Sequence, residues 1–142
     1  MSEALYQSLV LERSRTPLHA GPPLRFDAQG HGENRMCGDV VTMFFTQEGQ
    51  RWHHVAQGCA ILTASADLLC AACAGKNTAE ITCLGEKFEQ LVKTGVINPD
   101  LGELNALASI AQYPARLRCA TLPWSAVSNA LANSASGDAG HG

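Results

Sequence analysis

The first quarter of the chain changes from a helical pattern of apolar positions to a stretch rich in glycine and proline. Apolar residues recur four positions apart within residues 3–14, which predicts a helix. Thr16 precedes Pro17 and is therefore disfavoured in the helical conformation, so we expect the helix to end there. We interpret residues 18–35 as a long mobile loop with at most one brief strand, at 24–26.

The rest of the chain predicts a hairpin followed by helices. Residues 39–46 are rich in β-branched and aromatic side chains, and residues 51–57 can form the returning strand after a Gln-Glu-Gly-Gln turn. The later apolar patterns predict helices over 61–74, 78–94, 101–110 and 123–131. Together they predict one α+β domain over 1–131, a small antiparallel sheet of about three strands with helices packed on one face. The small, polar residues 132–142 are expected to form a disordered tail.

Composition narrows the class of protein. Of the 142 residues, 46% are hydrophobic and 16% are charged, which is typical of a globular chain rather than a disordered one. The formal net charge of −3 argues against a nucleic-acid partner. Apolar runs fall short of the ~18–20 residues that span a bilayer, and the N-terminus lacks an export-signal pattern. We therefore expect a cytoplasmic protein with no membrane partner.

Six cysteines need an explanation in such a chain, as metal ligands, nucleophiles or buried apolar residues. Cys37, Cys59 and Cys119 lie at boundaries of predicted elements, the last two before predicted helices, where the helix dipole favours a thiolate. Asp39 follows Cys37 by two residues, on the same side of the strand. Three thiolates and one carboxylate would form a tetrahedral zinc site or part of the ligand set of an iron–sulfur cluster. Alternatively, the three cysteines are small buried hydrophobic residues.

The other cysteines and a histidine pair favour structural roles. Cys70 and Cys73 form a C-x-x-C pair inside a predicted apolar helix, which favours core packing over a redox dithiol, and we expect Cys83 to be a core residue too. His53 and His54 point to opposite faces of a predicted strand, and we expect them to be surface imidazoles.

Four further residues are candidates for binding or packing roles. Arg116 and Arg118 precede Cys119 and are either solvated charges or contacts for an anion or a partner. Trp124 is expected to anchor the last helix by packing, and His31 is a weaker candidate for an additional metal ligand.

Three stretches of the chain resemble a known family. They are Cys37-Gly38-Asp39, then Gly58-Cys59-Ala60-Ile61 with Ala64-Ser65-Ala66, and the segment YPARLRCATLPW at 113–124. The stretches resemble the U-type iron–sulfur cluster assembly proteins, a group that contains IscU, the N-terminal domain of NifU, and SufU. The similarity extends over about residues 6–131. The long interval between Cys59 and Cys119 resembles the SufU branch, as does Arg118, where IscU-like proteins have histidine.

This resemblance implies a function and a fold of the IscU/SufU type. In SufU-like proteins three cysteines and an aspartate bind zinc, so the ligands would be Cys37, Asp39, Cys59 and Cys119. A SufS-like, pyridoxal-phosphate-dependent cysteine desulfurase would dock, a zinc–cysteine bond would be exchanged for a ligand of the desulfurase, and the freed thiolate would take the persulfide sulfur. By position the acceptor would be Cys37, with Cys119 as the alternative favoured in IscU-like relatives. Downstream iron–sulfur assembly or acceptor proteins would then receive the sulfur, making this chain an accessory to the desulfurase rather than a stand-alone enzyme.

Two alternative functions use the same residues. The chain could be a scaffold that binds iron and assembles a [2Fe–2S] cluster on Cys37, Cys59 and Cys119 before passing it to apo-proteins. It could instead be a purely structural zinc module that binds a partner without carrying sulfur.

Overall fold

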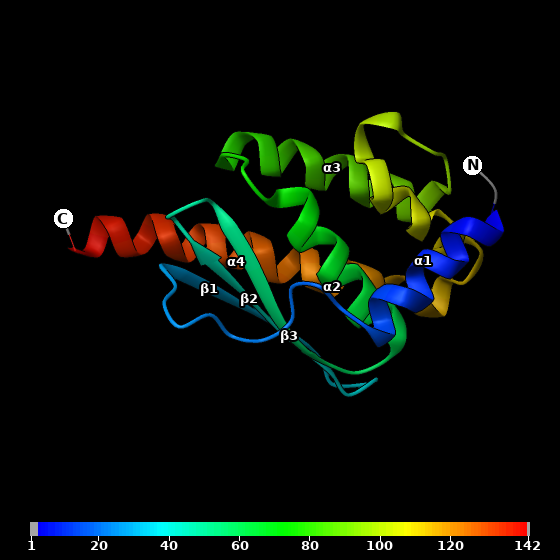
Figure 1. Ribbon diagram of the computed structural model, residues 1–142, viewed down its shortest axis with the longest axis horizontal. Helices are drawn as coiled ribbons and strands as arrows, with labels where there is room; N and C mark the ends of the chain where they lie inside the picture. Colours follow the sequence, from blue (N-terminus) through cyan, green and yellow to red (C-terminus); the bar gives the residue numbers. More distant parts are fainter. Residues whose placement is uncertain (1–2, 142) are drawn as a thin grey trace.

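Helices cover one face of a three-stranded antiparallel sheet in the computed structural model, which describes residues 3–141, with side chains described for 7–134 (Figure 1). In chain order the elements are α1 (Glu3–Arg15), β1 (Ala28–Asn34), β2 (Asp39–Thr46), β3 (Arg51–Gln57), α2 (Ala60–Cys73), α3 (Thr78–Thr94), the 3₁₀ segments η1 (Pro99–Gln112) and η2 (Pro114–Arg116), and α4 (Leu117–His141). The strands lie in the order β1-β2-β3. This arrangement confirms the predicted α+β class. Residues 1, 2 and 142 of the predicted domain and tail lie outside the described residues.

Strand β1 forms where the sequence predicts a mobile loop, and that prediction is wrong for these residues. The strand contains Gly30 and Gly32, which have low strand propensity. Helix α4 crosses β1 so closely that a Cβ atom on Gly30 would overlap the backbone of Ala126 and Ala130. The glycines therefore allow the backbones of β1 and α4 to approach closely. This is a requirement of the tertiary structure, which local strand propensity does not predict.

The outer edge of β1 is covered by side chains of α4. The side-chain amide of Asn129 donates a hydrogen bond to the carbonyl of His31 at 3.0 Å, and that of Asn133 donates to the carbonyl of Gln29 at 2.8 Å. These bonds occupy acceptors that an edge strand would otherwise present to another chain. Asn133 lies within residues 132–142, which the sequence predicts to be a disordered tail. Helix α4 therefore contacts the sheet beyond residue 131.

Helix α4 begins at Leu117, not near Pro123 as predicted, and continues to His141 through most of residues 132–142. Proline is common in the first turn of a helix, which is why the sequence predicts a start there, but Pro123 lies inside α4. Cys119 is consequently a residue of the helix's first turns. Trp124 packs against Gly85 of α3, where a Cβ would overlap the indole, which confirms its predicted packing role.

Helices α3 and η1 form close to where the patterns predict them. Asn77 and Glu80 make a reciprocal capping box at the start of α3, and Gly95 ends the helix in the left-handed conformation. Gly102 has a φ of 52° and kinks η1.

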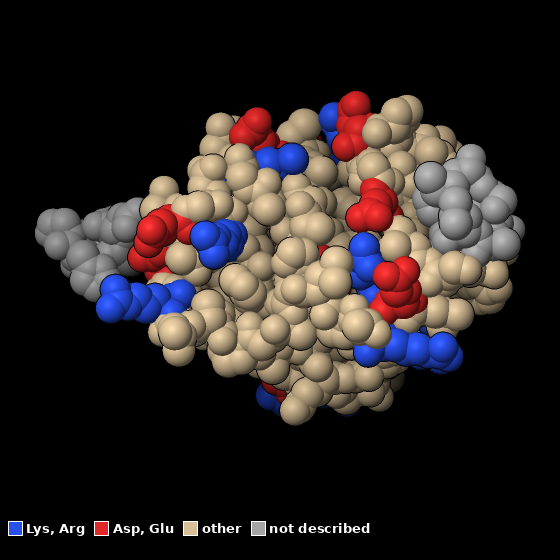
Figure 2. Space-filling model, viewed as in Figure 1, with Lys and Arg blue, Asp and Glu red and all other residues tan. Residues whose placement is uncertain are grey.

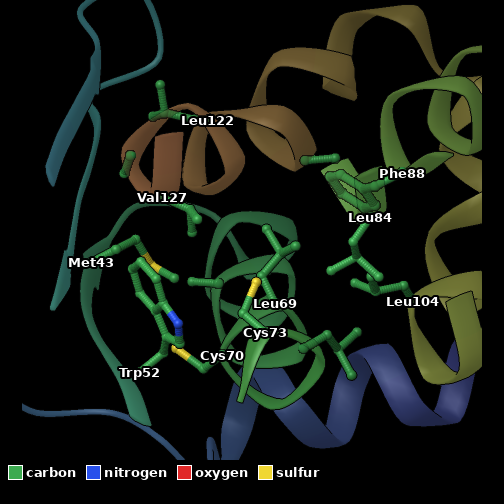
Figure 3. Packing of buried hydrophobic residues seen from close by; sticks show 14 of the residues in the cluster. Met43, Trp52, Leu69, Cys70, Cys73, Leu84, Phe88, Leu104, Leu122 and Val127 are labelled. Atoms are coloured by element: carbon green, nitrogen blue, oxygen red, sulfur yellow. The ribbon is translucent and has the colours of Figure 1, made fainter. Parts of the chain in front are cut away.

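The hydrophobic core surrounds α2 (Figure 3). Cys70 and Cys73 are 1% and 0% exposed, and Figure 3 shows their side chains among apolar neighbours that include Trp52 and Leu69. Burial raises the pKa of Cys73 to about 12 and the pKa of Cys70 well above its ordinary value. Both thiols therefore stay protonated at neutral pH, and the predicted packing role is confirmed. Cys83, in contrast, is exposed on α3, so its expected core position is wrong.

A buried polar network ties the segment after α1 to the core, and its histidine was expected at the surface. His54 is 1% exposed because it points to the inner face of β3, and its Nε2 lies 3.1 Å from Oδ1 of Asp67 on α2. The Asp67 carboxylate also accepts hydrogen bonds from the backbone N–H groups of Leu18 at 3.0 Å and His19 at 2.8 Å. Backbone hydrogen bonds from His54 to the carbonyl of His19, and from Gly21 to the carbonyl of His54, fix this segment along the free edge of β3.

The Asp67 carboxylate gives the fold an acid-sensitive component. Burial raises its pKa, but the hydrogen bonds from His54, Leu18 and His19 outweigh burial and bring the pKa below its ordinary value. A carboxyl group whose pKa is lower in the folded state stabilises the fold fully above its unfolded-state pKa of about 3.9. That contribution is lost as the pH falls through the folded-state pKa.

We expect Asp67→Asn to lower the free energy of unfolding of the metal-free protein by about 2 kcal/mol near pH 7. The amide would leave one of the buried N–H donors without its acceptor. The difference in the free energy of unfolding between the variant and the parent chain should shrink below about pH 4, because the Asp67 carboxylate of the parent chain then becomes protonated and loses its charge. Urea unfolding at several pH values measures both effects. Asp100→Asn, which removes an exposed ion pair with Lys87, is the matched control and should cost less than about 1 kcal/mol. A deficit for Asp67→Asn that is equal at all pH values would contradict this account.

Charged side chains of both signs are interspersed on the face shown in Figure 2. Ion pairs of the described residues include Lys87 with Asp100 and Arg13 with Glu12. Among the helices of the described residues, none is both long and apolar enough to cross a membrane.

Candidate metal centre

One group of metal-ligating side chains forms at the end of the sheet where β2 begins. Cys37, Asp39 and Cys119 each place one donor atom within 4.8 Å of those of the other two. Cys37 lies in the turn between β1 and β2, Asp39 is the first residue of β2, and Cys119 lies near the start of α4. The fold thus brings together three of the four predicted ligands from two distant parts of the sequence.

A tight turn positions Cys37. Asn34 and Asp39 pair across the ends of β1 and β2, and the N–H of Cys37 donates to the carbonyl of Asn34 at 3.2 Å. Gly38 has a φ of +73°, a conformation that a residue with a Cβ adopts only with strain. Cys37 is exposed in this turn. It therefore lies in a defined turn that follows a short strand, not at the end of the long mobile loop that the sequence predicts.

Cys59 adjoins the group from the N-terminus of α2. It is the N-cap residue of α2, and its backbone N–H donates to Oδ1 of Asp39 at 3.3 Å. Gly58 permits this approach, because a Cβ on it would overlap the Asp39 carboxylate. Sequence reasoning assigned no role to Gly58, although a glycine directly before a candidate ligand was the available signal.

The electrostatics of the group favour a bound cation. Asp39 is 1% exposed, and its buried Oδ2 has no hydrogen-bond partner among the described residues. Burying a carboxylate oxygen without a partner is costly. Burial raises the pKa of Cys119 to about 12, and the neighbouring Asp39 and Cys59 side chains add to the shift. Three sulfur donors and one oxygen donor are a ligand set that zinc accepts, so the residues present fit a divalent zinc ion.

Exposure differs sharply among the three cysteines. Cys119 is 1% exposed, Cys59 is half-buried and Cys37 is exposed. A large partner could therefore reach the sulfur of Cys37 most directly, and that of Cys119 least.

Three further candidate residues lie outside this group. Arg116 and Arg118 are exposed on the segment that leads into Cys119. His31 is also exposed, with its Nδ1 3.2 Å from the hydroxyl of Thr42, and it is not a member of the group formed by Cys37, Asp39 and Cys119.

Comparison with known proteins identifies the family. The model for the NifU-like N-terminal domain matches residues 5–133, nearly the whole chain. The chain belongs to the family of NifU-like N-terminal domains. Its relatives include proteins named IscU, an iron–sulfur cluster assembly scaffold protein, and SufU, a zinc-dependent sulfurtransferase, which confirms the resemblance seen in the sequence.

Two curated relatives illustrate the names found in the family. The chain is 34% identical over 137 residues to the iron–sulfur cluster assembly scaffold protein IscU of Streptococcus pyogenes serotype M1, covering 92% of this NifU-like chain and 85% of the relative. It is 26% identical over 141 residues to the zinc-dependent sulfurtransferase SufU of Bacillus subtilis strain 168. This match covers 96% of this chain and 95% of the relative.

A solved structure supports the fold independently. The crystal structure of the N-terminal part of a nitrogen-fixing NifU-like protein from Brucella abortus superposes with a TM-score of 0.80. It covers 95% of this NifU-like chain and 99% of the other chain, at 18% identity.

Proposed function

We propose that this NifU-like chain is a zinc-binding sulfur acceptor that takes persulfide sulfur from a cysteine desulfurase. The observation that carries the proposal is the convergence of donor atoms of Cys37, Asp39 and Cys119 within 4.8 Å of one another. The backbone N–H of Cys59 donates to the same Asp39 carboxylate, which places Cys59 beside this group. The four side chains would hold the zinc ion. Bound zinc would keep the ligating thiols deprotonated at neutral pH.

Cys37 is the proposed acceptor because it is the exposed cysteine of the group. Its thiolate would attack the terminal sulfur of the persulfide on the desulfurase cysteine. A bond forms between Cys37 Sγ and that sulfur while the S–S bond of the donor persulfide breaks, and its electron pair leaves on the desulfurase cysteine as a thiolate. The transfer involves no net oxidation or reduction. Gly38 and the short β1–β2 turn present Cys37 at the surface for this step.

The proposed docking surface lies beside the metal centre. Exposed Arg116 and Arg118 would contact acidic groups of the desulfurase. Arg116 also lines an apolar groove of about 410 Å³, together with residues that include Leu11, Ile61 and Tyr113. Ile61 follows Cys59 by two residues, so the groove and the metal centre share the N-terminal end of α2.

The metal and sulfide content of the purified protein tests the proposal. Protein prepared anaerobically without added metal should contain about one zinc ion per chain and no acid-labile sulfide, as expected for a closed four-ligand site. Metal analysis and a sulfide assay on the same sample measure this. Asp39→Asn is a useful companion variant, because it replaces the negatively charged oxygen ligand with a neutral amide and should lower zinc content. Iron with matching sulfide would contradict the zinc assignment.

A cluster scaffold is the second candidate function. The observation that favours it is the 34% identity to a relative that is itself named a scaffold protein for iron–sulfur cluster assembly. On this reading Cys37, Cys59 and Cys119 would bind a [2Fe–2S] cluster. Reconstitution with iron and sulfide that yields a stable, transferable cluster would support the scaffold over the zinc-dependent acceptor.

A further inference from the structure

Among the described side chains, one buried hydrogen bond connects the two helices that carry Cys59 and Cys119. Ser65 of α2 is 0% exposed, and its hydroxyl donates to the carbonyl of Ala120 on α4 at 2.6 Å. Ala120 directly follows Cys119, and Ser65 lies on the helix that Cys59 caps. The bond therefore joins the two helices that support the metal centre. Its acceptor residue, Ala120, is the neighbour of the proposed ligand Cys119.

The start of α4 needs such a support because its own hydrogen bonding is incomplete. Proline has no N–H, so Pro123 cannot supply the helical hydrogen bond to the carbonyl of Cys119. The carbonyl of Ala120, in contrast, can still accept its helical bond from the N–H of Trp124. The bond from Ser65 is thus an additional link between helices, and its loss would leave no orphaned acceptor on Ala120.

We propose that Ser65 is a positioning residue of the metal centre: its hydroxyl fixes the first turns of α4 against α2 and so holds Cys119 in place relative to Cys59 and Asp39. The inference rests on the proposed function in so far as these three residues bind the metal. Residues that orient metal ligands without touching the metal typically affect metal affinity by about 10–100-fold.

Cobalt(II) binding to the metal-free full chain tests the proposal, because tetrahedral thiolate coordination gives visible d–d bands and a thiolate-to-cobalt charge-transfer band. We expect Ser65→Ala to weaken cobalt affinity about tenfold, measured by competition with a chelator, and to change the intensity of these bands. Ser125→Ala is the matched control. It removes a hydroxyl of α4 that bonds within that helix, to the carbonyl of Thr121 at 3.4 Å, and should leave affinity and spectrum unchanged.

The outcomes separate this inference from the proposed function. A parent chain that binds cobalt, with Ser65→Ala equal to it in affinity and spectrum, would overturn the positioning role alone. A parent chain that binds no cobalt or zinc would overturn the proposed function and this inference with it. If Ser65→Ala does not fold, Ser65→Thr decides, since it keeps the hydroxyl: affinity near that of the parent supports the role, and a tenfold loss contradicts it.

Discussion

Alanine in place of Cys37 is expected to abolish sulfur acceptance from the desulfurase while the chain stays folded. Stimulation of desulfurase turnover should fall to the level measured without this protein, because the attacking thiolate is gone. Cys37 is exposed in a turn, so its truncation creates no cavity in the core. We expect the free energy of unfolding of the metal-free protein to change by less than about 0.5 kcal/mol.

Desulfurase turnover and labelled-sulfur transfer measure the effect, and Cys83→Ala is the matched control. Cys83 is also exposed but lies on α3, outside the metal centre, and its removal should leave sulfur acceptance intact. Full stimulation of desulfurase turnover by the Cys37→Ala variant would exclude Cys37 as the acceptor and leave Cys119 as the alternative. A purely structural zinc module predicts the opposite result, in which a change at Cys37 weakens the zinc-bound fold and leaves turnover unaltered.

Gly30→Ala should produce the largest loss of stability of the substitutions considered. The added methyl group would overlap backbone atoms of Ala126 and Ala130, and a backbone cannot yield by changing a rotamer. Either α4 moves away from β1 or the strand distorts, at a cost of about 3 kcal/mol or more.

Gly32→Ala provides a graded comparison on the same strand. Its Cβ would meet Leu122 at 3.2 Å, both the side chain and the carbonyl, a contact that a small shift relieves. Urea unfolding should therefore rank the variants as parent, Gly32→Ala and Gly30→Ala in order of falling stability. Equal stability of Gly30→Ala and the parent chain would show that α4 is not held against β1 as described.

The sequence predicts the elements whose residues carry their own local signals. β2, β3, α2 and α3 combine clear periodicity with turn or capping residues, and they form close to the predicted positions. β1 was missed because its glycines are selected by contact with α4, which no local pattern contains. His54 was misplaced because strand alternation shows that neighbours face opposite ways but does not show which face is buried.

The candidate site was predictable in its residue types but not in its geometry. The chemistry of Cys37, Asp39, Cys59 and Cys119 is visible in the sequence, as is their place at element boundaries. The burial of Cys119, and the cradle that Gly58 forms around Asp39, depend on how α4 and α2 meet the end of the sheet. Cys37 is exposed and Cys119 is buried, and this difference in exposure favours Cys37 as the sulfur acceptor.

The covered edges of the sheet also determine how partners can bind. Asn129 and Asn133 occupy carbonyls on the outer edge of β1, and the segment from His19 to Gly21 is bonded to the free edge of β3. An incoming peptide would have to displace these bonds before it could add as a fourth strand, so recognition by β-augmentation is disfavoured at both sides of the sheet. A partner protein must instead recognise side chains and loops, and the same two covers protect the sheet from strand-mediated self-association.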